Sequence, residues 1–527
     1  MNSSGELHQA SAHCIRTGGT PNDEAEPIQV SWLGRIYPDS WMSCLCFLLL
    51  SLAVGQIWRH PFTDEMDAII ALEKFGPLQM FKGMWGVLLH PPVFYALFSL
   101  VYQISPHLAV LRLFALLCST LTVFLFHQLF LNLSRNPPTE DRLIAIFAFA
   151  TIPLLLRWGD TIRWYPIFTL LFALLVVTLV RRPSVIWGPA MLLGALSFVN
   201  IEGYLITACV ALYRYVIERH RISSDLKFLV ITACFQALPL PFYYAIFTSS
   251  VNEARGFNAL HLHSFLNQGL GDYFELVVGF FGGYAFGIGL VWVLLPILAV
   301  TGLALFQLVQ RFGETDPVER LALVTFGLTA PWAVYWNSAY SFIYAALLLT
   351  YVILKAISRT DIPMIKVAVL STFLLTNGAV IGNLRGGDHP FQRVYPGPYR
   401  DMAEAISRNF SRGDMVISTD PNLLPLLDPR VDCVRVFPYT DMVRTGPDCP
   451  FKNKEGGRRD RGPGRVLLFE GHDRSEESWW KNVVTDATSG RRLVAWIPYK
   501  YDADAELKTR LSGVALDPFV FSIRIFE

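Results

Sequence analysis

The sequence has few charged residues and lacks the short motifs of common soluble enzymes. Only 17% of its 527 residues are Asp, Glu, Lys or Arg, whereas roughly a quarter are charged in soluble domains. Its eight cysteines include no C-x-x-C pair, which is the spacing typical of zinc and redox sites. The net charge of +1 and the lack of a basic face argue against a nucleic-acid partner. No soluble nucleotide-binding motif is found.

The beginning of the chain lacks the signature of a cleaved signal peptide. Residues 1–40 are polar and mixed in charge, without the basic start and early apolar run of such a peptide. We therefore expect a polar cytoplasmic tail over 1–40, followed by an uncleaved membrane helix.

Long apolar runs are abundant. Hydrophobic residues make up 53% of the chain, and apolar runs of about 20 residues, enough to cross a bilayer core of roughly 30 Å as a helix, recur between Trp41 and Gly382. The sequence predicts a polytopic α-helical membrane protein. The predicted spans are 41–58, 108–132, 142–157, 166–180, 184–200, 202–217, 227–247, 287–310, 320–336, 339–357 and 363–382.

Basic connectors orient these spans, because Lys and Arg accumulate on the cytoplasmic side. They fall at every second connection, provided that "HPPVFYALFSLVYQI" (90–104) does not cross the membrane. This stretch is short for a crossing, and we expect it to lie in the outer interface or to re-enter the bilayer. The prediction is eleven spans with the amino terminus in the cytoplasm. The basic connectors are 134–142, 181–183, 214–221, 310–320 and 355–361.

The composition changes after Gly382. "PYRDMAEAISRNFSRGDMVISTD" (398–420) predicts an amphipathic helix, a turn at Arg412–Asp414 and a strand, and "GRVLLFEG" and "RRLVAWIPY" predict two further strands. We expect 41–382 to form the transmembrane catalytic domain and 383–527 an extracytoplasmic, soluble α/β domain.

Cys433 and Cys449 lie in this second domain, which would face an oxidising compartment. They bracket a loop rich in turn-forming residues. A disulfide between them is the favoured interpretation, and two buried thiols are the alternative.

Acids and arginines gather on the predicted outer side. Asp64 and Glu65 are adjacent where the first span ends, and "RWGDTIRWYP" (157–166) follows a later span. Such residues could simply cap helices and mark the interface, but ionisable groups at membrane depth are costly. A carboxylate can act as a general base toward an acceptor hydroxyl, and arginines can hold a phosphate bidentately. The pattern favours a reaction between a hydroxyl and a lipid-linked phosphate.

The order of motifs over 41–200 resembles the GT-C glycosyltransferases of the protein O-mannosyltransferase and aminoarabinose-transferase type. In that family, the first outer loop carries an Asp-Glu pair, a His/Lys-Pro-Pro helix follows, and an Arg begins the next span. A second outer loop often ends in Arg-x-Tyr. The matching residues here are Asp64-Glu65, His90-Pro91-Pro92, Arg112 and Arg163-Trp164-Tyr165.

The resemblance implies an inverting glycosyltransferase that moves a sugar from a polyprenyl-phosphate-linked donor to an acceptor hydroxyl outside the membrane. In that picture Asp64 is the catalytic base, and Glu65 orients the acceptor or a metal. The implied donor-phosphate ligands are Arg157 and Arg163, and the implied sugar- or acceptor-binding residues are His90, Asp160 and Tyr165.

The second outer loop departs from the family pattern, since it reads "RWGDTIRWY" where many bacterial members have a Ser-Gln-Glu-like stretch. The role of Asp160 is therefore open. A divalent metal is a candidate cofactor, because some relatives hold one with an acid and a histidine. His261 or His263 could serve here, and ordinary loop histidines are the alternative.

Two other functions fit part of the pattern. A transporter or flippase of lipid-linked sugars would also be polytopic, but its charges should lie near mid-membrane, whereas here they cluster on one side. An inactive relative kept as a subunit is the second. The acceptor is left open between a lipid, a glycan and a protein. We expect the bacterial inner membrane, with the active site and the C-terminal domain outside the cytoplasm, and endoplasmic reticulum as the alternative.

Overall fold

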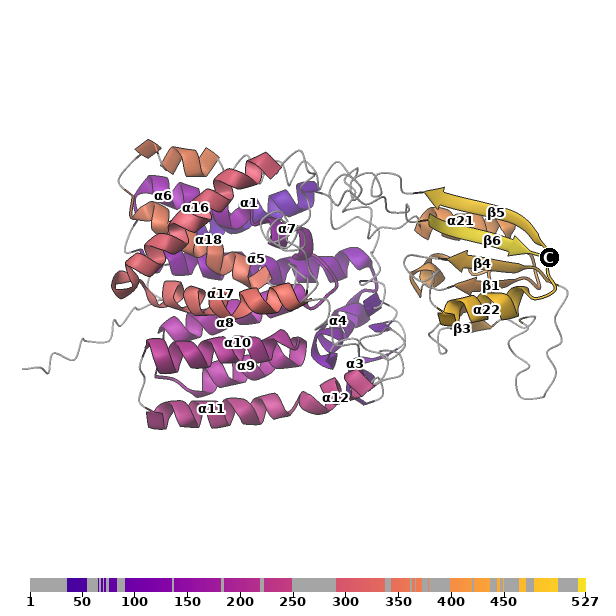
Figure 1. Ribbon diagram of the computed structural model, residues 1–527, viewed down its shortest axis with the longest axis horizontal. Coiled ribbons are helices and arrows are strands. Elements are labelled where there is room, and N and C mark those ends of the chain that lie inside the picture. Colours follow the sequence, from indigo (N-terminus) through magenta and orange to yellow (C-terminus); the bar gives the residue numbers. More distant parts are fainter. Residues whose placement is uncertain are drawn as a thin grey trace, which may run out of the picture.

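The computed structural model has a helical bundle followed by a sheet domain (Figure 1). It describes residues 36–54, 65, 68–69, 71–72, 75–82, 91–134, 137–181, 184–218, 222–248, 291–336, 343–360, 363–364, 366–371, 378, 399–418, 421–436, 443–445, 449, 464–470, 478–500 and 520–527.

The bundle is built from apolar helices whose buried faces form one continuous hydrophobic core. The helices are α1 (Pro38–Val54), α3 (Pro77–Lys82), α4 (Pro92–Ile104), α5 (Leu108–Leu133), α6 (Thr139–Ala150), α7 (Pro153–Trp158), α8 (Tyr165–Arg181), α9 (Trp187–Val199), α10 (Glu202–Leu212), α11 (Ile222–Ala237), α12 (Leu240–Thr248), α16 (Val291–Gln310), α17 (Pro317–Trp336) and α18 (Ile343–Ser358).

Most predicted spans coincide with a helix, but some are interrupted. The predicted span 142–157 is broken between α6 and α7, and the predicted span 227–247 between α11 and α12. Pro153 and Pro239 lie at these breaks, where proline removes a backbone donor and disfavours helix in the preceding residue. Among the described residues, α5 is the one helix that is both long and apolar enough to cross a membrane by itself. The count of eleven spans stays a prediction.

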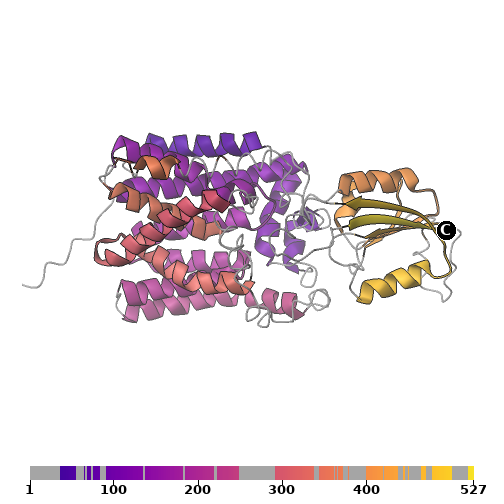
Figure 2. The same ribbon diagram turned by 45° about the horizontal axis from the view of Figure 1, so that its top comes forward.

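Helix α4 covers the stretch that we expected not to cross. Its 13 residues span about 20 Å at the α-helical rise, well short of a bilayer core. One face buries Phe94, Tyr95 and Phe98, while Leu100 and Ile104 on another face are 52% and 84% exposed. Such a helix is amphipathic and suits the edge of the bundle, where Figure 2 shows it next to α3.

The basic connectors gather at the opposite end of the bundle, where they are paired with acids. Lys355 binds Asp316 at 3.3 Å and also donates to the carbonyl of Leu133, so it joins three segments. We call this end the paired-charge end. Its other ion pairs are Asp39–Arg142, Asp141–Lys366, Arg214–Asp225, Glu218–Arg320 and Glu319–Arg359.

Topology reporters test the orientation that these charges suggest. A reporter fused after Asn136, between α5 and α6, should be cytoplasmic, and one fused after Gly159, between α7 and α8, should be external. The reason is that 90–104 is expected not to cross, which would put the basic connectors inside. Alkaline phosphatase and fluorescent-protein activities measure the two positions. Reversal of both would show that 90–104 crosses the membrane.

The described residues of the sheet domain form six strands in the order β3-β2-β1-β4-β6-β5. Strands β2, β1 and β4 are parallel, and β6 runs antiparallel to both of its neighbours. Helix α21 (Tyr399–Asn409) packs on one face, and α22 (Ser478–Thr488) packs on the other. The strands are β1 (Met415–Ser418), β2 (Cys433–Val436), β3 (Val443–Thr445), β4 (Val466–Glu470), β5 (Leu493–Lys500) and β6 (Val520–Phe526).

The predicted helix, turn and strand at the start of this domain are confirmed. α21 ends at Asn409, and β1 begins at Met415. Between them Gly413 has a φ of 88°, a left-handed conformation that glycine adopts without steric cost. Asp414 then binds Arg465 at 2.8 Å, which joins the turn to the segment entering β4.

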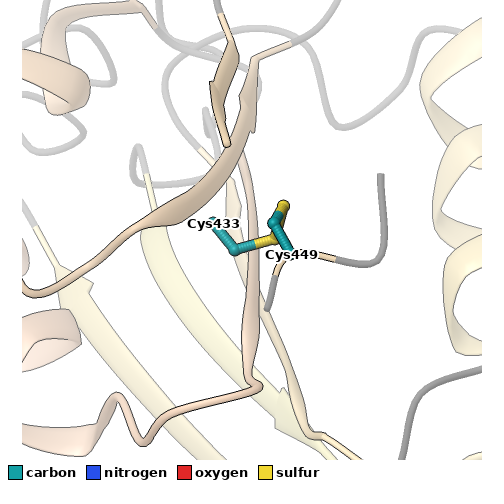
Figure 3. The surroundings of a disulfide bond; sticks show 2 residues. All are labelled: Cys433 and Cys449. Atoms are coloured by element: carbon teal, nitrogen blue, oxygen red, sulfur yellow. A yellow bond between two sulfur atoms is a disulfide. The ribbon is translucent and has the colours of Figure 1, made fainter. Parts of the chain in front are cut away.

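Figure 3 shows Cys433 and Cys449 joined by a disulfide, as predicted. Both residues are buried. Cys433 is the first residue of β2 and pairs across to Thr445 of β3. The bond therefore holds the segment that follows β3 against the edge of the sheet. Closing a loop of this size contributes about 3 kcal/mol by restricting the unfolded chain.

Thiol labelling tests the bond in the protein itself. Denatured protein should accept two more thiol-reactive mass tags after reduction than before, because the other cysteines that the structure describes are free thiols. Gel mobility or intact mass counts the tags. In the Cys433→Ser/Cys449→Ser control, reduction should add none. Full labelling of the wild type without reductant would contradict the bond.

Candidate active site

Glu65, which follows the end of α1, lies at the centre of a buried polar cluster. Its side chain is fully buried. The Nη2 group of Arg112 donates to Oε2 at 2.8 Å, and Nε of the same guanidinium lies 3.3 Å from Oε1. The backbone N–H of Ile162 donates to Oε1 at 3.0 Å. Both carboxylate oxygens are therefore engaged, and three segments distant in sequence meet at one residue.

Arg112 comes from the second turn of α5, and its whole side chain is buried. A buried guanidinium needs compensating negative charge. Glu65 supplies this charge directly, and Asp160 lies close enough to interact electrostatically. The pairing explains how an apolar helix accommodates an arginine near its start.

The loop between α7 and α8 is held against α5 by short contacts. Ser119 Oγ donates to the carbonyl of Gly159 at 2.7 Å. A Cβ on Gly159 would lie 2.3 Å from the carbonyl oxygen of Leu155 and 2.8 Å from Ser119 Oγ, so only glycine allows this approach. Thr161 Oγ1 donates to the carbonyl of Trp158 at 2.7 Å. The loop therefore presents Asp160 and Arg163 from a fixed backbone, and both side chains are buried.

Aromatic rings extend from this loop into the bundle. The ring of Tyr165 lies 5.5 Å from that of Trp158 and 4.4 Å from that of Trp164. Trp164 contacts Phe168, whose ring lies 5.6 Å from that of Tyr344 on α18. These are ordinary spacings for packed aromatic pairs.

Glu202 is a buried carboxylate at the start of α10. It interacts electrostatically with Tyr344 and Tyr243. Sequence analysis gave it no role. Its only signal was a lone acid near the outer end of a predicted span.

The structure brings together several of the residues expected at the site, but it does not cover all of them. Glu65 meets the 157–166 loop through Ile162, and this loop carries Asp160, Arg163 and Tyr165. Asp64, His90, His261 and His263 lie outside the described residues. Arg157 belongs to α7, but its side chain also lies outside them.

The contacts of Arg112 and Ile162 were not predicted. Arg112 had appeared only as a motif match without a partner, although an unpaired charge in an apolar span is itself a signal that an acid must lie nearby. No sequence signal marks a backbone N–H as a ligand, so the bond from Ile162 required the structure.

The described residues contain no cluster of three or more His, Cys, Asp or Glu that could hold a metal. A divalent metal therefore remains an expectation for the parts of the outer side beyond them.

Comparison with solved structures finds one protein in two states. ArnT from Cupriavidus metallidurans in the apo state aligns with a TM-score of 0.52 and 11% identity, covering 91% of this chain and 97% of that chain. The chain has an ArnT-like fold. The same enzyme bound to undecaprenyl phosphate aligns with a TM-score of 0.52 and 12% identity, covering 93% and 98%. No protein-family model and no curated protein sequence matches the chain.

ArnT is a GT-C aminoarabinose transferase and a polytopic membrane protein. The predicted resemblance to GT-C membrane glycosyltransferases is therefore confirmed at the level of the fold. The alignment runs over more than nine tenths of both chains. It thus extends beyond residues 41–200, where the motifs carried the resemblance.

The pairing of Glu65 with Arg112 can be tested with a double-mutant cycle. Glu65→Gln and Arg112→Met should each destabilise the protein by about 3–5 kcal/mol, because each leaves a buried charge unpaired. The double variant should lose less than the sum, with a coupling of about 1–3 kcal/mol. Thermal unfolding in detergent measures all four proteins.

Arg408 provides the matched control, since it pairs with Glu404 on the surface and is 76% exposed. Arg408→Met should cost less than about 1 kcal/mol. Strict additivity of Glu65→Gln and Arg112→Met would mean that the buried pair contributes nothing.

Proposed function

We propose that the protein is an inverting glycosyltransferase that moves a sugar from a polyprenyl-phosphate-linked donor to an acceptor hydroxyl on the extracytoplasmic face of the membrane. The acceptor hydroxyl attacks the anomeric carbon from the face opposite the phosphate. The bond to the phosphate oxygen breaks, and polyprenyl phosphate leaves. The acceptor hydroxyl releases its proton as the new bond forms, and a base must take up this proton.

The observation that carries this proposal is the buried contact between Glu65, Arg112 and the α7–α8 loop. It joins the Asp-Glu segment to the loop bearing Asp160 and Arg163, so the acid and arginine motifs belong to one site. The ArnT-like fold supports the same reaction class, and one of the two ArnT structures is bound to undecaprenyl phosphate.

The contacts of Glu65 suggest how its role differs from that of its neighbour. Both of its oxygens already accept hydrogen bonds from Arg112 and Ile162. A carboxylate held in this way is suited to positioning. We therefore assign the proton-accepting role to Asp64, as the family resemblance implies, and a positioning role to Glu65.

Arginines supply the positive charge for the leaving phosphate in this mechanism. Guanidinium groups stay charged and bind phosphate oxygens bidentately. We assign this role to Arg157 and Arg163. Tyr165, His90 and Asp160 are assigned to the sugar or the acceptor. We place the protein in the bacterial inner membrane. The acceptor that carries the hydroxyl is a lipid, a glycan or a protein.

The alternative function is transport or flipping of a lipid-linked sugar. It would need charged groups that face a path through the bundle. In the described residues, however, the buried ion pairs of the bundle lie at its two ends, around Glu65 and at the paired-charge end. In the described residues this leaves no buried ion pair midway along the bundle, which favours an enzyme over a transporter.

Separate assays of binding and transfer test the proposal. Purified protein in lipid nanodiscs should bind undecaprenyl phosphate, and Arg163→Ala should weaken this binding by about tenfold or more, since a charge-assisted contact is lost. Arg430→Ala is a suitable control, because Arg430 is an exposed arginine that pairs only locally with Asp428. Equal binding by wild type and Arg163→Ala would contradict the assigned phosphate site.

The base is tested by Asp64→Asn, which keeps the shape of the side chain and removes the proton acceptor. Transfer of radiolabelled sugar from a polyprenyl-phosphate donor in envelope membranes should fall by about 10²–10⁴-fold, with undecaprenyl phosphate binding unchanged. Glu65→Gln should lower thermal stability as well as activity. Wild-type transfer by folded Asp64→Asn protein would contradict the mechanism.

A further inference from the structure

The sheet domain presents one face on which an aromatic ring lies beside an ion pair of a buried acid and an exposed arginine. Ile523 and Ile525 of β6 point to the α21 side, where they pack in the larger hydrophobic core of the domain. Because side chains alternate along a strand, Ser522 and Arg524 point to the opposite face. The register places Arg524 opposite Trp496 of β5 and opposite Leu468 of β4.

The charged part of this face is well defined. Arg524 Nη2 lies 2.7 Å from Glu470 Oε2, and Ser522 Oγ donates to the same oxygen at 3.1 Å. The carboxylate side chain is only 8% exposed, whereas that of Arg524 is 39% exposed. Ser522 and Arg524 thus hold the buried carboxylate of Glu470 in place, while part of the Arg524 guanidinium stays accessible to a ligand.

The aromatic part of the face is open. Helix α22 covers this side of the sheet around Ile417, Val466, Leu468 and Phe526. Trp496 nevertheless remains 57% exposed. Its ring lies on the same face of the sheet as Arg524, which is opposite it in the register. We call Trp496, Arg524, Glu470 and Ser522 the β5–β6 patch.

We infer that the β5–β6 patch binds a saccharide. A pyranose has an apolar face of C–H groups and an edge of hydroxyls, so it needs a flat ring together with fixed donors and acceptors. Trp496 offers the ring, Arg524 offers planar N–H donors, and Glu470 and Ser522 hold that guanidinium in place. The patch carries one positive and one negative charge, which suits a neutral or weakly charged glycan better than a strongly anionic ligand.

The position of the patch connects it with the acceptor side of the reaction. The chain end after β6 lies on the side of the domain away from the bundle in Figures 1 and 2. Strands β4 and β5 run antiparallel to β6, so their carboxyl ends, near Glu470, face the bundle. The inference that the saccharide is part of the acceptor rests on the proposed transferase function; saccharide binding by the patch does not.

Saturation-transfer-difference NMR on the full-length protein in detergent micelles tests the patch directly. The probes are chitobiose, mannobiose and the β-1,6-linked glucosamine disaccharide. All proteins carry Asp64→Asn, so transfer chemistry does not affect the signal. At least one disaccharide should bind. Trp496→Ala should weaken its binding about tenfold or more, as loss of an aromatic anchor does, and Arg524→Lys should weaken it by removing the planar fork.

Leu493→Ala is the matched control. Leu493 is an apolar residue of the same strand and is 49% exposed, but it lies opposite Phe526, away from Glu470. The Leu493→Ala protein should bind the disaccharide as well as the parent protein does. Thermal unfolding should show that all variants are folded. The inference would be overturned if none of the three disaccharides binds, or if the Trp496→Ala protein binds as well as the parent protein.

Two further outcomes separate the explanations. If Trp496→Ala changes the oligomeric state in mass photometry while saccharide binding persists, the patch is a self-association surface and the inference is wrong. If disaccharides bind through Trp496 while the undecaprenyl phosphate and transfer assays fail, the patch stands and the proposed transferase function fails. If no disaccharide binds while the undecaprenyl phosphate and transfer assays succeed, the proposed transferase function stands and the inference about the patch fails.

Discussion

The contact between Glu65 and Arg112 determines how the site end of the bundle is assembled. Two opposite charges withdrawn from water attract strongly, but each is costly alone. Here the carboxylate also accepts the N–H of Ile162. The segment after α1, the start of α5 and the α7–α8 loop are therefore joined through one buried carboxylate. Two further hydrogen bonds, from Ser119 to Gly159 and from Thr161 to Trp158, also hold the α7–α8 loop in place.

The two ends of the bundle use charge differently. At the paired-charge end, ion pairs join connectors to one another, and their burial varies. Arg320 and Glu218 are 26% and 24% exposed, whereas Arg214 and Asp225 are 3% and 4% exposed. These pairs add cross-links between helix ends. At the site end, Glu65 and Arg112 are almost completely buried, and Asp160 and Arg163 lie in the loop next to them. Burial there makes electrostatic interactions stronger, which suits the glycosyl transfer proposed above.

Much of the fold could be predicted from the sequence, because apolar length and strand patterns are strong signals. Helix α5 and strands β1, β4 and β5 lie where their segments were expected. The alternation of basic connectors also predicted that α4 would not cross. The breaks at Pro153 and Pro239 were missed, since a proline inside an apolar run can either kink a span or divide it. Strand β6 was missed as well, although the alternation of "VFSIRIF" is visible in hindsight.

The candidate site was predicted less completely than the fold. Motif order led us to expect Glu65, Asp160 and Arg163 in one site, but it did not indicate which acid would meet which arginine. That choice depends on the rotation of α5 about its axis and on the path of a short loop, and neither follows from local patterns. The exposed Trp496 was hidden for another reason: in the sequence it lies within an apolar strand, and only the sheet register places it beside Arg524.

The order of strands in the sheet has a consequence for biosynthesis. β6 lies between β4 and β5, yet it follows both in the chain. Until β6 is inserted, β4 and β5 each expose an unpaired edge, and such edges are prone to pair with other chains. If the domain crosses the membrane as an extended chain, most of it must emerge before its centre can close. The centre of the sheet therefore closes only when the last strand of the domain has been made.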